Sequence, residues 1–123
     1  MTLLALLLAA AAGAPPMPVG GRTKAPDAKV AGAALEEARG FAARSLKCGD
    51  AGSATASLMP KGWAPADPNF RIGPKGARYE RWEIALCGRS EPFLVVFWKD
   101  KGRADFQVAH PFPEGPAERA KRR

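Results

Sequence analysis

The stretch that most constrains the fold runs from Tyr79 to Pro111 and contains three segments with the residue pattern of β-strands. In the first, Trp82, Ile84 and Leu86 alternate with more polar residues, as in a strand with one buried face. The second, Phe93–Trp98, is apolar at every position, which is typical of a central strand covered on both sides. The pattern predicts the middle of an antiparallel sheet.

Polar turns separate these three strands. Gly88–Pro92 is expected to form the first turn, with Pro92 starting the central strand because proline disrupts a strand interior. Lys99–Arg103 supplies the second turn and includes a glycine that can adopt a positive φ. Phe106 and Val108 then alternate with polar residues in the third strand. An antiparallel meander is the simplest assembly.

One helix is predicted over Asp27–Lys47. Leu35, Ala38 and Ala42 recur at three- and four-residue steps, and charged residues occupy the other side. Because this apolar stripe is narrow and rich in alanine, we expect the helix to pack on the sheet rather than lie on a membrane. With a short strand near Ala54–Met59, the predicted fold is α+β, with one N-terminal helix packed on a three- to four-stranded antiparallel meander.

The N-terminus has the features of a secretory signal. Residues 1–14 are uncharged and apolar, and the run is shorter than the about 20 residues needed to span a membrane. Ala12-Gly13-Ala14 resembles a cleavage site, although a basic start is missing and a buried helix is the alternative. We therefore expect a periplasmic or secreted protein without a transmembrane anchor. Residues 15–26 are expected to be a flexible spacer rich in proline and glycine, and residues 27–112 a single domain.

The chain has two cysteines, Cys48 at the end of the predicted helix and Cys87 at the end of the first meander strand. In an exported chain such a pair predicts one structural disulfide. A redox pair and a lone cysteine nucleophile are the alternatives. CxxC motifs, clustered histidines and glycine-rich phosphate loops are absent from the sequence, so neither a metal nor a cofactor is expected.

The segment 50–76 is rich in proline and glycine and is expected to be largely irregular. If the helix covers one face of the central strand, either this loop or another protein must cover the other. The predicted contact for a protein partner, or for a second copy of the chain, is one of two alternating sets: Phe93, Val95 and Phe97, or Leu94, Val96 and Trp98.

Residues 113–123 form a predicted disordered basic tail. The chain has 19 Lys and Arg against 12 Asp and Glu, a net charge of +7. Four of these positive charges belong to the tail residues Arg119, Lys121, Arg122 and Arg123. The tail is either a solvated end or a contact for an anionic lipid or glycan of the envelope, and export argues against nucleic acid as the partner.

Catalytic motifs are scarce. The sequence contains no G-x-S-x-G element, and its one histidine, His110, lies at a predicted strand end. Glu80 and Glu83 are expected on opposite faces of a strand, so they do not form a paired acid–base site. A small hydrolase that uses His110 is therefore the last of three hypotheses.

A resemblance adds to this interpretation. Glu80-Arg81-Trp82, then Cys87-Gly88, an aromatic–aliphatic strand and a glycine-containing turn before Asp105-Phe106 resemble small uncharacterised exported proteins of Gram-negative bacteria. The resemblance covers about 30 residues and implies an envelope location and a structural Cys87, but no activity. We expect a non-enzymatic protein-binding module of the cell envelope, with binding of an envelope polyanion through the tail as the alternative.

Overall fold

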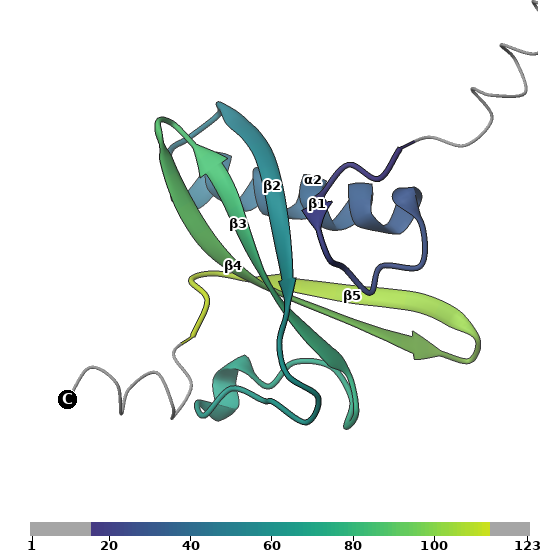
Figure 1. Ribbon diagram of the computed structural model, residues 1–123. Coiled ribbons are helices and arrows are strands. Elements are labelled where there is room, and N and C mark those ends of the chain that lie inside the picture. The colour runs from purple at the N-terminus through teal and green to yellow at the C-terminus, as the bar shows by residue number, and fades with distance from the viewer. Residues whose placement is uncertain (1–15, 114–123) are drawn as a thin grey trace, which may run out of the picture.

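The computed structural model describes residues 16–113 and shows one α-helix packed against a five-stranded sheet (Figure 1). The elements in chain order are β1 (Gly20–Gly21), α2 (Ala28–Ser45), β2 (Ala51–Leu58), a short 3₁₀ helix (Pro68–Phe70), β3 (Arg78–Leu86), β4 (Arg89–Asp100) and β5 (Arg103–Ala109). The strands lie in the sheet in the same order as in the chain. The predicted α+β class is confirmed.

The predicted meander is formed by β3, β4 and β5, which pair in antiparallel fashion. Two-residue turns join them, Cys87-Gly88 between β3 and β4 and Lys101-Gly102 between β4 and β5. All four turn residues have positive φ angles, the conformation that matches the twist of a tight hairpin. The first turn is therefore shorter than the predicted Gly88–Pro92.

Pro92 lies inside β4, where it is paired with Glu83 of β3. The carbonyl oxygen of Pro92 accepts a hydrogen bond of 2.9 Å from the main-chain nitrogen of Phe112, so this residue faces the β5 side. On that side β5 pairs with β4 only from Leu94 onward. Proline is tolerated at this position because β5 no longer pairs with β4 there. A main-chain N–H, which proline lacks, would have no partner in β5.

The helix α2 begins where the sequence predicts. Asp27 is the N-cap, and its side chain accepts a hydrogen bond of 2.9 Å from the main-chain nitrogen of Val30. The buried face consists mainly of small residues: Ala31, Ala34, Leu35, Ala38 and Ala42. Small side chains let the helix approach the sheet closely, so α2 covers one sheet face (Figure 1).

The expectation of three to four antiparallel strands is wrong, because the sheet has five strands and is mixed. The additional strand β1 pairs in parallel with β2, with Gly20 opposite Thr55 and Gly21 opposite Ala56. Two glycines have no side chains that could alternate between apolar and polar, so hydrophobic periodicity cannot predict this strand. Glycine is required at Gly21, where φ is +76° and a Cβ atom would collide with the carbonyl oxygen of Ala56.

Apolar layers cover both faces of the sheet. On the helix face, Trp82 and Ile84 of β3 and Phe93, Val95 and Phe97 of β4 form one cluster with α2. On the opposite face, the second cluster gathers side chains from β3, β4, the loop after β2 and the segment after β5: Tyr79, Leu94, Val96 and Phe112, with Met59, Trp63, Phe70, Ile72 and Trp98 packed against them.

The predicted partner surface on the central strand requires a correction. Residues 93–97 are each at most 5% exposed, and Trp98 is half-buried. The sequence left two candidates for covering the sheet face opposite the helix, the loop after β2 or another protein. In the structure the loop after β2 covers this face. Neither alternating set of β4 therefore forms a free apolar ridge within residues 16–113.

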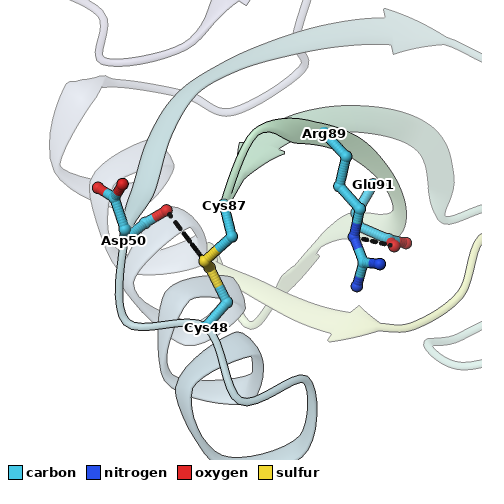
Figure 2. The surroundings of a disulfide bond; sticks show 5 residues. All are labelled: Cys48, Asp50, Cys87, Arg89 and Glu91. Carbon is cyan, nitrogen blue, oxygen red and sulfur yellow. Dashed lines mark hydrogen bonds and ion pairs between the residues drawn. A yellow bond between two sulfur atoms is a disulfide. The ribbon is translucent and has the colours of Figure 1, made fainter.

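The predicted disulfide joins Cys48, just after α2, to Cys87 in the β3–β4 turn, with a Cα–Cα distance of 6.1 Å (Figure 2). The main-chain oxygen of Asp50 lies 3.4 Å from the Sγ atom of Cys48 and accepts a hydrogen bond of 3.2 Å from the main-chain nitrogen of Cys87. The bond and this contact attach the C-terminal end of the helix to the sheet.

Two predictions fall on residues that the structure does not describe. The signal peptide (1–14) and the tail residues Arg119, Lys121, Arg122 and Arg123 lie outside residues 16–113. Within residues 16–113, no helix combines the length and apolar character needed to cross a membrane.

Candidate functional site

The loop between β2 and β3, residues 59–77, is fixed to the sheet at both of its ends. The main-chain nitrogen of Met59 donates a hydrogen bond of 3.0 Å to the carbonyl oxygen of Tyr79. The hydroxyl of Tyr79 donates one of 2.9 Å to the carbonyl oxygen of Ile72. Trp63 stacks on Phe112 with ring centroids 5.5 Å apart and contacts Tyr79 edge-on at 5.6 Å. An irregular segment is thereby held in one position.

Arg71 is oriented by the same loop. Its Nε atom donates to the carbonyl oxygen of Pro65 at 2.7 Å, and a terminal nitrogen donates to that of Ala66 at 3.2 Å. Neutral carbonyl groups thus hold the guanidinium without cancelling its charge. Burial raises the pKa of the Tyr79 hydroxyl, and the positive charge of Arg71 opposes this shift.

A depression of about 560 Å³ lies beside this loop and β3. Its apolar lining includes Trp63 and Tyr79. Its cationic lining consists of Lys61, Arg71, Lys75 and Arg78. We call it the larger depression.

A second depression, of about 300 Å³, lies between the segment before α2, the end of the same loop, and the β4–β5 hairpin. Lys24, Lys75, Arg78 and Lys99 supply its cations, and Trp98 contributes an aromatic wall. We call it the smaller depression. The two depressions share the segment Pro74–Arg78.

Buried Glu80 positions the segment that carries Lys24. Its carboxyl group accepts hydrogen bonds from the main-chain nitrogen of Lys24 and, at 2.9 Å, from Nε1 of Trp82. Glu80 is 0% exposed, and among residues 16–113 no cation forms an ion pair with it. It therefore acts as an internal acceptor that joins the N-terminal segment to β3.

The charge around the two depressions has one sign. Together they are lined by six cationic side chains: Lys24, Lys61, Arg71, Lys75, Arg78 and Lys99. We call this set the basic face. Within residues 16–113, no aspartate or glutamate lines either depression, and none of the six takes part in a side-chain ion pair. Clustered like charges with no acidic partner create a local field that attracts anions.

His110 lies away from the basic face. Its Nε2 atom is 3.0 Å from Oε2 of Glu91, and Glu91 also pairs with Arg89 at 3.1 Å (Figure 2 shows the latter pair). The ring packs against Phe41 of α2 and Phe93 of β4, with centroids 5.3 and 4.7 Å away. In the described part of the chain, no serine, threonine or cysteine is hydrogen-bonded to His110. These contacts hold the end of β5 against the helix.

Sequence reasoning did not find the basic face. The structure places Cys48 and Cys87 together, buries residues 93–97, and gives no position for the tail cations. The cations of the basic face come from separate segments of the chain, so no local charge run marks them. The available signal was the residual positive charge left after the tail is subtracted.

Among residues 16–113, no group of three or more histidine, cysteine, aspartate or glutamate side chains is arranged to hold a metal ion. Comparisons of the chain with protein-family models, with curated proteins and with solved structures found no significant match.

Proposed function

We propose that this protein is a non-enzymatic binding module of the cell envelope or extracellular space, and that its ligand is an anion bound at the basic face. The observation that carries the proposal is the set of six cations that line two adjoining depressions. Within residues 16–113, no acidic side chain lines either depression. In a folded chain, such a charge distribution is compensated most directly by an anionic ligand.

The shape of the site supports this proposal. Volumes of about 300 and 560 Å³ fall near or within the range of small-molecule sites. The arginine side chains supply forked donors that match carboxylate, sulfate or phosphate groups. Arg71 is already oriented by two carbonyl groups, so binding costs less side-chain entropy there.

The proposed compartment rests on the disulfide and the N-terminal sequence. A disulfide such as Cys48–Cys87 persists in oxidising compartments and is rare in the cytosol. The apolar run of residues 1–14 supports export independently.

The other sequence hypotheses are less well supported. The protein-partner hypothesis relied on an open ridge of β4, and residues 93–97 are buried. The hydrolase hypothesis relied on His110, whose ring contacts Glu91, Phe41 and Phe93. The tail hypothesis also predicts an anionic ligand, but bound by the cations of residues 119–123 instead of the basic face. The experiment must therefore distinguish binding at the tail from binding at the basic face.

The test is calorimetric titration of the full oxidised chain with inorganic tripolyphosphate at low salt and at about 0.15 M salt. The variant Lys61→Gln/Lys75→Gln/Lys99→Gln removes three cations of the basic face. We expect its affinity to fall about tenfold or more, since each lost contact is worth a fraction of a kcal/mol to about 1 kcal/mol. Higher salt should weaken binding to the unchanged protein.

The matched control is Lys29→Gln/Arg44→Gln/Lys47→Gln, which removes the same charge from exposed positions in or beside α2. Its affinity should stay within about twofold of the unchanged protein, because it alters only the distant field. A third chain lacks residues 119–123. Equal losses in both triple variants, or a loss confined to the tail deletion, would refute the basic face as the binding site.

A further inference from the structure

The two depressions adjoin one another, and this arrangement restricts the kind of anion. Lys75 and Arg78 line both, Lys61 and Arg71 line only the larger, and Lys24 and Lys99 line only the smaller. A compact anion seated in one depression leaves the outer cations of the other unpaired. A ligand with charges repeated along its length engages both ends. The distribution of cations therefore favours a chain over a small molecule.

On this basis, and resting on the proposed anion-binding function, we propose that the ligand is an acidic polysaccharide that crosses the segment Pro74–Arg78 and occupies both depressions. Its repeated carboxylate or sulfate groups pair with the outer and the shared cations. The Lys75 and Arg78 side chains bind the portion that crosses between the depressions.

The aromatic side chains argue against single-stranded nucleic acid. Proteins that bind single strands without sequence preference stack the bases on open aromatic faces. Trp63 stacks on Phe112 with an interplanar angle of 18° and also contacts Tyr79. Trp98 packs beneath Gly73, where an added Cβ would lie 3.1 Å from the indole ring. These contacts occupy one face of Trp63 and part of the Trp98 ring, which leaves less aromatic surface for stacking bases than an open platform provides.

The surface also argues against a membrane. Stable association with a lipid surface requires apolar side chains that insert below the headgroups, in addition to positive charge. Among residues 16–113, Met17 is the one large hydrophobic residue that is exposed, at 42%, and it lines neither depression. Cations in concave depressions without an apolar anchor suit a hydrated chain that enters them.

The test compares oligogalacturonates of increasing length, from the monosaccharide to the octasaccharide, by titration into the full oxidised chain. We expect a steep gain between the shortest and longest oligomers, about 100-fold or more, because the second depression is engaged intramolecularly. Lys61→Gln/Lys99→Gln, which alters one outer cation of each depression, should weaken octasaccharide binding more than disaccharide binding. Lys29→Gln/Lys47→Gln is the charge-matched control and should preserve the length dependence.

The outcomes separate this inference from the function on which it rests. If tripolyphosphate binds but the octasaccharide binds no more tightly than the disaccharide, the polysaccharide inference is overturned and the anion site stands. If none of these anions binds, both fail. If oligothymidylate of equal charge, or vesicles of phosphatidylglycerol, bind more tightly than the octasaccharide, the polysaccharide is the wrong class of ligand.

Discussion

Tyr79 of β3 donates a hydrogen bond of 2.9 Å from its hydroxyl to the main-chain oxygen of Ile72, in the loop beside the larger depression. Tyr79 lines that depression and is itself 8% exposed. One side chain thus belongs to the hydrophobic cluster, to the loop anchor and to the proposed site. Stability of the loop and affinity for the ligand are therefore expected to change together.

Replacing Tyr79 by Phe should reveal this link. The ring contact with Trp63 is retained, but the carbonyl of Ile72 loses its donor. We expect a loss of about 1 kcal/mol in the free energy of unfolding, measured by urea denaturation. Amide hydrogens of residues 60–77 should exchange faster, and tripolyphosphate should bind more weakly. Unchanged exchange in the loop would show that the hydrogen bond does not hold it.

Glu80→Gln should destabilise the protein despite its similar shape. The two carboxyl oxygens accept from the main-chain nitrogen of Lys24 and from Nε1 of Trp82, and an amide offers an oxygen to only one of them. A buried N–H is then left without an acceptor, at a cost of about 1–3 kcal/mol in the free energy of unfolding. Glu37→Gln, at an exposed position of α2, is the comparison and should leave the free energy of unfolding nearly unchanged. An equal urea midpoint for Glu80→Gln and the unchanged protein would contradict the assigned role.

Reduction of the Cys48–Cys87 bond should lower stability substantially. The two cysteines are 39 positions apart, a span for which the chain-entropy model gives about 4 kcal/mol. Guanidinium denaturation with and without a thiol reductant measures the difference. In Cys48→Ala/Cys87→Ala the reductant should have no effect. A reductant effect of equal size in that variant would mean that the loss has another origin.

The lowered pKa of the Glu83 carboxyl group leads us to expect that the stability of the protein depends on pH. Burial acts to raise the pKa of its carboxyl group, but hydrogen bonds from Ser90 and Arg81 and the charge of Arg81 together lower it below its ordinary value of 4.5. A lowered folded-state pKa stabilises the protein above the unfolded pKa, and this contribution is lost as the pH falls through the folded pKa. Glu83→Gln should therefore be less stable than the unchanged protein at pH 6–7, and the gap should close below about pH 4.5. Ser90→Ala should narrow the gap, and a gap that is constant down to pH 3 would contradict the assignment.

Side-chain alternation was sufficient to predict the meander. Trp82, Ile84 and Leu86 do face the helix, and the uniformly apolar run in β4 is covered on both sides. Such patterns are informative because burial acts on successive side chains of one strand. The same reasoning placed Pro92 at the start of a strand, whereas it lies inside β4. Its tolerance there depends on where β5 stops pairing with β4 and on the hydrogen bond from Phe112, and neither can be inferred from the residues around Pro92.

The rest depended on contacts between distant segments. β1 consists of two glycines and pairs through backbone atoms alone, so no side chain indicates it. Glu80 lies two residues before Trp82, and strand parity would have placed it on the apolar face. The basic face gathers Lys24, Lys75 and Lys99, which only the tertiary fold brings together. Local sequence patterns therefore could not predict that these lysines lie around one depression.

The smaller depression takes its walls from both ends of the folded region, with Lys24 before α2 and Ala104 in β5. During synthesis, the polypeptide segment that bears Lys24 emerges long before the strand that completes the opposite wall. A nascent or truncated chain that stops before Ala104 lacks that wall, and a peptide copied from the loop after β2 carries the cations Lys61, Arg71 and Lys75 without their arrangement. The proposed anion binding at this place is therefore expected only after β5 has joined the sheet, so its onset would report that the last strand has folded.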